Sequence, residues 1–452
     1  MRQTHMAESV QSAPTASSKW LKAFTVYTRP RVLIVLLLGF SAGLPLALVT
    51  STLQAWLTQN GINLKTIGLF SLVGLRDTFK FFWAPLVDAL SIPLLTRLLG
   101  RRRSWLILSQ LLLIAAIVVL GFSDPKTSIF YVTVAALMVA AASATQDIVI
   151  DAFRVESLPQ EEQAAGIASY ILAYRVALLL SGAGALLLVA YLEASGVAQL
   201  TAWKVSYLAA AACVAVGMIA AFLAKEPADE SAKDDDGSPV KRVFATAISA
   251  FGEFLSRPLA ISILLFVLLF KFCDAFAGVL TVPFVLTTGF TLATYATVVK
   301  GVGFAAAVIG GLAGGALART LPLTTCLWIA AIVQMLSNLM FSWLAWMGPD
   351  VSALTLTIIV ENFTSNAANV IFVAYLSALC GARAHTATQF ALLSATAAVG
   401  RTVLAASGGY VAEATGWFWF FIVTTFSAIP SILLLIWLQR RGHFASLEAE
   451  KK

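Results

Sequence analysis

The chain has 452 residues, of which 59% are hydrophobic and only 12% are charged, and its mean hydropathy is +0.87. Soluble domains carry about 25% charged residues, so this composition excludes an ordinary soluble globular protein and indicates a polytopic membrane protein. The net charge of +7 would suit a nucleic-acid-binding surface. The basic residues, however, cluster in loops between apolar segments, which is a pattern of membrane topology, and we expect no nucleic-acid partner.

The first stretch, residues 1–31, is polar and rich in Ser and Thr, with no apolar core. We therefore expect a cytoplasmic tail and no cleaved signal peptide. Twelve hydrophobic segments follow, each long enough to cross a hydrocarbon core of about 30 Å as a helix. Their approximate ranges are 32–57, 65–90, 104–122, 127–152, 163–192, 200–224, 258–288, 291–317, 321–347, 351–380, 386–413 and 416–438.

The distribution of Lys and Arg predicts the orientation. With the N-terminus in the cytoplasm, the opposite side receives only Lys65, Lys126 and Lys204, whereas the cytoplasmic loops and tails receive most of the 30 basic residues. Because cytoplasmic loops are enriched in Lys and Arg, we expect both termini, including the tail 439–452, to lie in the cytoplasm.

The widest gap between segments is residues 225–257, and it divides the chain into 32–224 and 258–438, with six segments each. The gap begins as an acidic linker and continues, from about residue 240, with apolar residues at helical spacing. We expect this second part to form an amphipathic helix on the inner leaflet.

The two halves share a motif. Arg-x5-Ser-Gly, starting at Arg175 in the fifth segment, recurs starting at Arg401 in the eleventh. Together with the six-plus-six arrangement, the repeat predicts an all-α membrane protein of the major facilitator fold, with twelve transmembrane helices in two pseudo-symmetric bundles. We expect a monomer in the lipid bilayer.

Two acidic residues stand inside the fourth segment, in the string SATQDIVIDAFRVESLP (143–159). Asp147 and Asp151 are four residues apart and share one helical face. A charged side chain at the bilayer centre costs about 2.5–3.5 kcal/mol on insertion scales. We therefore interpret the pair, with the neighbouring Gln146, as part of a water-accessible pathway. The alternative for Asp151 alone is that it caps the cytoplasmic end of the helix beside Arg154.

Further charges lie inside the predicted segments, and uncompensated they would cost more than a typical protein's stability. Two i, i+3 pairs can neutralise themselves within one helix and have only a structural role; these are Asp77 with Lys80 and Lys271 with Asp274. The remaining basic residues are Arg76, Arg175, Lys300 and Arg401. Arg175 and Arg401 have no in-helix partner and occupy related positions, so we expect them to bind cargo or a carboxylate of another helix.

The tenth segment carries a polar stripe, formed by Asn362, Asn366 and Asn369 after Glu361. Such a stripe is either a core amide network or a set of ligand contacts. The predicted substrate-binding residues are Arg175, Arg401, Asn366, Asn369, Gln146 and Lys271. No histidine lies inside a segment, so a proton relay would use carboxylates, and the predicted proton-coupling residues are Asp151, Asp147, Asp274 and Glu361.

The loop between the second and third segments contains Asp88, Arg97 and the run Gly100–Arg103. This order is similar to the loop signature of the facilitator superfamily, although the spacing here is longer. We predict that Asp88, Arg101 and Arg154 take part in gating by pairing that changes as the two halves move. The alternative is that the arginines only retain the loop in the cytoplasm.

Several strings of residues are characteristic of one family. They are GFSAGLPLAL (39–48), LKTIGLFSLVG (64–74), FKFFWAPLVD (79–88), GRRRSWL (100–106), SATQDIVIDAFRVESLP (143–159), KFCDAFAG (271–278) and ATQFALLSA (387–395). In these strings the chain resembles the AmpG-type muropeptide permeases, from the first segment through the eleventh.

The resemblance implies import across the inner membrane of a Gram-negative bacterium, driven by the proton gradient and without a cofactor. The implied cargo is N-acetylglucosamyl-1,6-anhydro-N-acetylmuramic acid, with or without its stem peptide, released in peptidoglycan recycling. In many members this import feeds the signal for β-lactamase induction and hence antibiotic resistance. The resemblance also makes Asp151 the first coupling residue to test.

Other functions remain open at this stage. A sister carrier would move another anionic cargo, such as acetyl-CoA, a peptide or a sugar. A membrane-embedded transferase would need a His/Asp or metal constellation inside the bilayer, and the segments contain none. A signalling or scaffold protein would not need so many buried charges. We therefore expect a transporter, with no enzymatic activity and no metal.

Overall fold

The computed structural model describes residues 25–75, 92, 93, 95–227, 252, 255–380 and 386–449, and the regular secondary structure in these ranges is entirely helical. The first half contains η1 (Val26–Thr28), α2 (Pro30–Val49), α3 (Ser51–Gln59), α4 (Leu64–Leu69), the 3-10 helix η2 (Phe70–Leu75), α7 (Leu95–Leu99), α8 (Arg101–Phe122), α9 (Ile129–Ser157), α10 (Gln160–Leu179), the π-helix η4 (Leu180–Gly184), α11 (Ala185–Ala194) and α12 (Gln199–Leu223).

The second half contains α14 (Ala260–Phe270), α15 (Phe272–Gly278), α16 (Thr281–Thr287), α17 (Leu292–Thr294), the π-helix η6 (Tyr295–Val302), α18 (Gly303–Thr320), α19 (Leu323–Met347), α20 (Val351–Leu379), α21 (Thr386–Val399), the π-helix η7 (Gly400–Leu404), the 3-10 helix η8 (Ala405–Ser407), α22 (Gly408–Phe426), α23 (Ile429–Arg440) and α24 (His443–Ala449).

Ten helical stretches of the described residues are long and apolar enough to cross a membrane. They correspond to the predicted segments, except that 65–90 is described only as far as Leu75 and the last two segments form one stretch, Leu392–Arg440, of 49 residues. At 1.5 Å per residue this stretch would measure about 73 Å, more than twice a bilayer core of about 30 Å. Gly416, with φ 75° and ψ 167°, interrupts it inside α22, at the first residue of the predicted segment 416–438.

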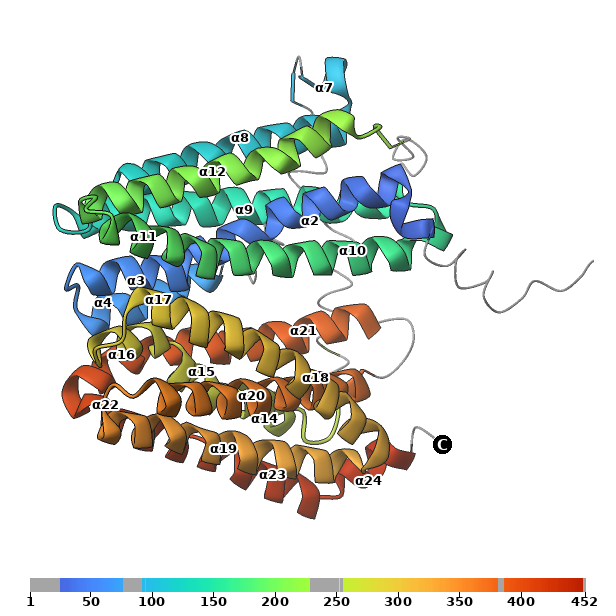
Figure 1. Ribbon diagram of the computed structural model, residues 1–452. Helices are drawn as coiled ribbons and strands as arrows, with labels where there is room; N and C mark the ends of the chain where they lie inside the picture. The colour runs from blue at the N-terminus through green and yellow to red at the C-terminus, as the bar shows by residue number, and fades with distance from the viewer. Residues whose placement is uncertain are drawn as a thin grey trace, which may run out of the picture.

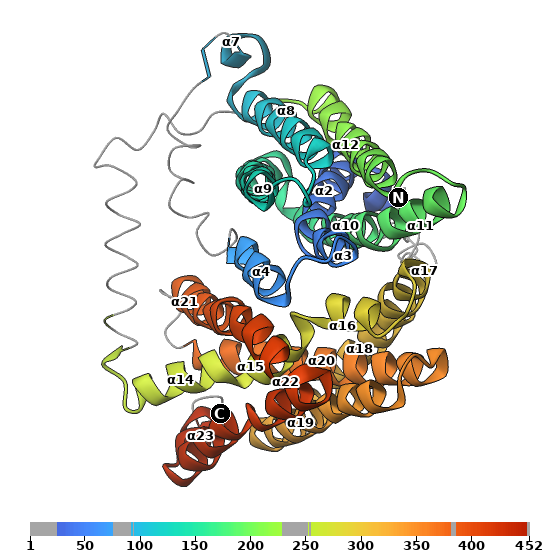
Figure 2. The ribbon, with the colours of Figure 1, turned by 90° about the vertical axis from the view of Figure 1, so that its left-hand side faces the viewer.

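The helices form two groups (Figures 1 and 2). Helices α2 to α12 lie together and are called here the N-terminal bundle, and α14 to α24 form the C-terminal bundle. Large apolar side chains such as Leu112, Ile261 and Leu312 are exposed on the outside. In water this surface would be unfavourable, whereas a bilayer solvates it.

Glycines allow close packing within each bundle, because small residues let the backbones of two membrane helices approach each other. A Cβ atom added at Gly43 of α2 would lie 2.3 Å from the carbonyl oxygen of Tyr174 on α10, and one added at Gly310 of α18 would lie 2.1 Å from that of Phe363 on α20. Two further glycines make the same kind of contact with the same pairs of helices: Gly39 and Gly314. These four glycines therefore let α2 pack closely on α10 and α18 on α20.

The bundles pack against each other at one end, on the left in Figure 1, where α3 contacts α16 and α4 contacts α22. Departures from α-helical geometry gather along this interface: η4 packs on η6, and η2 packs on η7 and η8. On the predicted orientation this is the periplasmic end, because α2 begins and α20 ends at the opposite, cytoplasmic side.

Some predicted features lie outside the described residues. These are Arg76, the Asp77–Lys80 pair, Asp88 of the proposed gate and most of the amphipathic helix expected after residue 240.

Candidate functional site

A cavity of about 740 Å³ lies between the two bundles, lined by α2, α3, η2 and α10 on one side and by α15, α16, η6, α18, α20 and η7 on the other. It contains most of the residues predicted from the sequence to bind substrate or protons. These are Arg175, Lys271, Asp274, Glu361, Asn366, Asn369 and Arg401.

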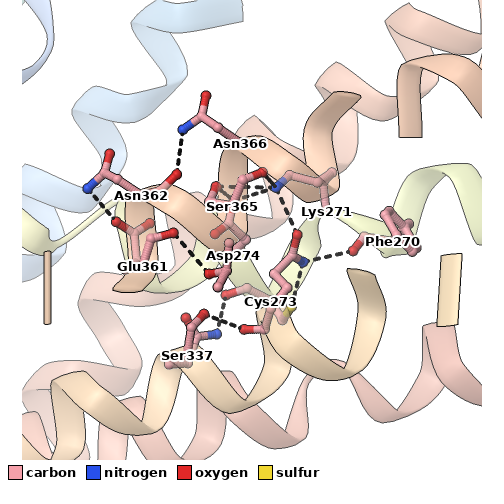
Figure 3. A network of polar contacts seen from close by, with 12 residues as sticks. Phe270, Lys271, Cys273, Asp274, Ser337, Glu361, Asn362, Ser365 and Asn366 are labelled. Atoms are coloured by element: carbon pink, nitrogen blue, oxygen red, sulfur yellow. Dashed lines mark hydrogen bonds and ion pairs between the residues drawn. The ribbon is translucent and has the colours of Figure 1, made fainter. Parts of the chain in front are cut away.

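Lys271 occupies the break between α14 and α15, where its φ of −96° and ψ of 5° depart from helical values. Its side chain is buried, and Nζ lies 2.7 Å from Asp274 Oδ2. Nζ also donates to Gln334 Oε1 at 2.8 Å and to the carbonyl oxygen of Ser365 at 3.2 Å (Figure 3). The i, i+3 ion pair predicted for this helix therefore forms, and it links three helices while still lining the cavity.

Helix α19 supports the break from behind. The Gln334 amide donates to the carbonyl oxygen of Phe270 at 3.2 Å and to Cys273 Sγ at 3.1 Å. Asn338 Nδ2 donates to the carbonyl oxygen of Cys273 at 3.2 Å. Both α19 residues are fully buried. They give backbone groups around an irregular turn the partners that the bilayer does not supply.

The polar stripe of α20 faces the same cavity. Ser365 Oγ donates to Asp274 Oδ2 at 2.8 Å, and Asn362 Nδ2 donates to Glu361 Oε2 at 2.8 Å. Asn366 Nδ2 donates to the carbonyl oxygen of Asn362 at 2.9 Å. The stripe is thus partly an amide network of its own helix, and its members also present polar atoms to the cavity.

Three basic side chains line the cavity on different elements: Arg175 on α10, Lys300 on η6 and Arg401 on η7. None of the ion pairs formed by the described residues includes any of them. Lys300 Nζ lies 5.8 Å from the centre of the Tyr295 ring. A Cβ at Gly182 of the N-terminal bundle would lie 3.8 Å from Lys300 Cε, so Lys300 reaches the boundary between the bundles.

Lys300 and Asn362 were not among the predicted site residues, although the sequence contained a signal for both. Lys300 is a lone charge inside a membrane segment, and Asn362 belongs to the stripe of α20. The sequence did not show that both face the same space as Arg175 and Arg401.

Other predicted residues lie elsewhere. Gln146 is fully buried in α9 and donates to Ser41 Oγ of α2 at 3.0 Å, and Asp147 beside it is also buried. Asp151 Oδ1 lies 3.4 Å from Arg154 Nη2, and the Asp151 side chain is 47% exposed. These three are not among the residues that line the cavity. The contact with Arg154 agrees with the alternative interpretation of Asp151.

The arginines proposed for gating lie at the end of the N-terminal bundle that is cytoplasmic on the predicted orientation. Arg101 begins α8, and the next residue, Arg102, pairs with Glu156 of α9 at 2.5 Å. The guanidinium of Arg154 lies 5.7 Å from the centre of the Tyr170 ring on α10. In the described part of the chain, these contacts tie helices of one bundle together.

Comparison with known proteins fits this geometry. The sequence model of the Major Facilitator Superfamily matches residues 35–388. The chain is 39% identical to the anhydromuropeptide permease of Escherichia coli K12 over 422 residues, which cover 93% of this chain and 81% of that protein. It is 32% identical to the putative transporter AmpG 4 of Rickettsia felis, covering 91% of this chain and 97% of that one.

Solved structures share the fold. The nucleoside transporter NupG, in the form of a point mutant, aligns with a TM-score of 0.66 and 14% identity, covering 92% of this chain and 99% of that one. A bacterial homologue of the human lysosomal transporter Spinster, in an inward-facing and occupied conformation, aligns with a TM-score of 0.64 and 14% identity, covering 93% and 97%.

Proposed function

The chain belongs to the Major Facilitator Superfamily and is related to the AmpG-type permeases, and from this premise we propose that it imports anhydro-muropeptides. The cargo would be N-acetylglucosamyl-1,6-anhydro-N-acetylmuramic acid, with or without its stem peptide. Import would run from periplasm to cytoplasm by proton symport, in peptidoglycan recycling. The protein would act as a monomer in the bacterial inner membrane.

The observation that carries the proposal is the charge of the cavity. Arg175, Lys300 and Arg401 line it, and the described residues form no ion pair with them. Such a cavity favours an anionic cargo. The muramic acid and peptide carboxylates of a muropeptide fit this charge, because a guanidinium binds a carboxylate through two parallel hydrogen bonds.

The amide stripe supports the same cargo class. Sugar hydroxyls and peptide groups both donate and accept hydrogen bonds, and so do the side chains of Asn362, Asn366 and Asn369. The volume of about 740 Å³ is within the range of about 300–1,000 Å³ that is usual for ligand pockets. Arg175 and Arg401 would hold the carboxylates, while the stripe would contact sugar or peptide amides.

Geometry favours Glu361 as the proton-coupling carboxylate. Asp274 pairs with Lys271 at 2.7 Å, whereas the hydrogen-bond partner of the Glu361 carboxylate is the amide of Asn362. Asp147 and Asp151 do not line the cavity. We propose that Glu361 takes up a proton together with cargo, so that the cavity reorients with less uncompensated charge.

The state described here would be inward-facing, since the bundles pack together at the predicted periplasmic end. Alternating access would then separate α3 from α16 and α4 from α22 and bring the cytoplasmic ends together.

The test is counterflow of radiolabelled anhydro-muropeptide in proteoliposomes, with and without a protonophore. Counterflow should survive the protonophore, because exchange needs no net driving force, whereas accumulation under an imposed pH gradient should disappear. Competition by excess unlabelled muropeptide but not by acetyl-CoA is expected. Absence of muropeptide counterflow, together with counterflow of radiolabelled acetyl-CoA in the same proteoliposomes, would point instead to a sister carrier.

A further inference from the structure

A second cavity, of about 620 Å³, lies at the cytoplasmic end of the N-terminal bundle on the predicted orientation. It is formed where α2 and α10 begin and α9 and α12 end. Its lining is Arg29, Pro30, Arg31, Ile34, Phe153, Glu156, Ser157, Glu162, Leu223, Lys225, Glu226 and Pro227. It shares no residue with the central cavity, so it needs an explanation of its own.

The acidic residues of this second cavity are already engaged by the protein. Glu162 Oε1 lies 2.6 Å from Arg29 Nη1, and Glu156 pairs with Arg102 at 2.5 Å. Glu226 accepts a hydrogen bond from the backbone N–H of Arg102, in the first turn of α8, at 2.7 Å. There a carboxylate is stabilised by the free N–H groups and the dipole of the helix. Two of the three carboxylates are therefore paired with arginines, and the third is held by the first turn of α8.

Two basic residues of the lining are in a different situation. Arg31 and Lys225 do not take part in any of the ion pairs formed by the described residues. They come from α2 and from the end of α12, so they border the cavity from two helices. When Arg102 is counted with its partner Glu156, four basic side chains stand against three carboxylates, so the site has a net positive charge.

Apart from Ser157, the remaining wall is apolar. Pro30, Ile34, Phe153 and Leu223 line it, and Leu223 is 66% exposed on α12, a helix whose composition suits the bilayer. A cationic end joined to an exposed apolar surface fits an amphiphile better than a free inorganic ion. Lipid phosphates lie at this level of the bilayer, at the ends of the spanning helices.

We propose that this cavity binds the headgroup of an anionic phospholipid of the inner leaflet. The phosphodiester would lie between Arg31 and Lys225, and the start of an acyl chain would follow Ile34 and Leu223. A bound lipid would connect the ends of α2, α9, α10 and α12 and thereby stabilise the N-terminal bundle. The proposal does not depend on which cargo the central cavity carries.

The experiment uses the full chain in detergent, titrated with phosphatidylglycerol or with phosphatidylcholine of the same acyl chains, and measures the thermal unfolding midpoint. The first lipid should raise the midpoint of the natural protein more than the second. Each Lys or Arg near an anionic membrane surface contributes to the affinity for anionic lipid. The loss of both basic residues should therefore weaken the binding of phosphatidylglycerol roughly tenfold or more. The Arg31→Gln/Lys225→Gln variant should therefore need a correspondingly higher concentration of phosphatidylglycerol for the same shift.

The matched control is Arg440→Gln/Arg441→Gln, which removes two exposed cytoplasmic charges outside this cavity and should keep the natural response. An equal response in both double variants would overturn the proposal. So would a full shift produced by the water-soluble headgroup glycerophosphoglycerol, because the acyl chain would then be unnecessary. If the first variant does not fold, two other variants replace it. Arg31→Lys/Lys225→Arg keeps both charges and should keep the response to phosphatidylglycerol. The single variant Lys225→Gln should retain less phosphatidylglycerol, which native mass spectrometry measures directly.

Discussion

Lys271 Nζ lies 2.7 Å from Asp274 Oδ2 in the wall of the central cavity. Removal of one partner of a buried ion pair leaves the other charge uncompensated and typically costs about 3–5 kcal/mol. We therefore expect Lys271→Met to lower the thermal unfolding midpoint of the detergent-solubilised protein markedly. The double variant Lys271→Met/Asp274→Leu should recover part of the loss, because it removes the orphaned carboxylate. A double variant less stable than the single one would mean that the carboxylate finds another partner.

Arg401 lines the cavity from η7 and provides a guanidinium fork. If it binds a peptide carboxylate, Arg401→Ala should weaken binding of peptide-bearing muropeptide by roughly ten- to a hundredfold, the value of a hydrogen bond to a charged group. Peptide-free cargo should lose much less. The measurement is the dissociation constant of each cargo, with Arg401→Lys as the control that keeps the charge without the fork. Equal losses for both cargoes would assign Arg401 a structural role.

Glu361 and Asp151 offer a direct comparison of two candidate coupling residues. Glu361→Gln mimics the protonated state, so counterflow should continue while accumulation driven by a pH gradient is lost. Asp151→Asn should retain gradient-driven accumulation, because Asp151 pairs with Arg154 at 3.4 Å and does not line the cavity. Both activities are measured in the same proteoliposomes. The opposite result, loss in Asp151→Asn alone, would move the coupling to the N-terminal bundle.

Gly409 of α22 lies where the bundles meet. An added Cβ would be 2.1 Å from the carbonyl oxygen of Leu64, and nearby Lys65 Nζ lies 3.3 Å from Glu413 Oε1. Gly409→Ala should therefore force the periplasmic ends apart and favour an outward-facing state.

The readout for Gly409→Ala is labelling of a cysteine placed at Ser71, a cavity residue, by an impermeant thiol reagent added from the periplasmic side. Labelling should increase several-fold. The control is Gly74→Ala, whose Cβ would lie 3.9 Å from Thr402 Cγ2 across the same interface, an ordinary contact. Similar labelling in both variants would show that the contact at Gly409 does not hold the bundles together.

His443, in α24 after the last span, predicts a pH dependence. Its Nε2 lies 3.1 Å from the Tyr375 hydroxyl, and burial lowers the pKa of His443 from 6.5 to about 4. His443 therefore binds a proton in docked α24 only at a pH well below the one at which it does so in the undocked helix. Its docking free energy is complete above pH 6.5 and is lost as the pH falls through the range down to the folded-state pKa.

Hydrogen exchange of α24 should consequently be faster at about pH 5 than at about pH 7.5, relative to the intrinsic rate. In His443→Phe this difference should vanish, since no titrating group remains there. Equal protection at both pH values in the natural protein would show that the imidazole is accommodated in its charged form.

Much of the fold follows from the sequence because the bilayer imposes a length on each apolar segment. The break at Gly416 agrees with a boundary predicted from hydrophobicity alone. The irregular elements were not predicted. Residues of η4 and η6 continue an apolar helical pattern, and their departure from α geometry arises where two bundles press against each other, which a single segment does not encode.

The candidate site was predictable to a similar extent. The sequence predicted Arg175, Asp274 and Arg401 as site residues, because charged side chains inside apolar segments need a partner or water. Which face of a helix lines the cavity depends on how the helices pack. The sequence therefore did not predict that Gln146 hydrogen-bonds Ser41 of α2 and does not line the cavity. The position of Lys300 could not be predicted, because it depends on packing against Gly182 of η4 in the other bundle.

The two halves of the chain contribute unequally to the charge of the central cavity. Among the described lining residues, Arg175 is the one charge from the first half, whereas Lys271, Asp274, Lys300, Glu361 and Arg401 belong to the second. Within the described lining, a change of cargo during evolution would then require substitutions mainly among residues of the second half. Permeases of this lineage that differ in cargo should therefore diverge along α15, η6 and α20 and remain alike along α2 and α3.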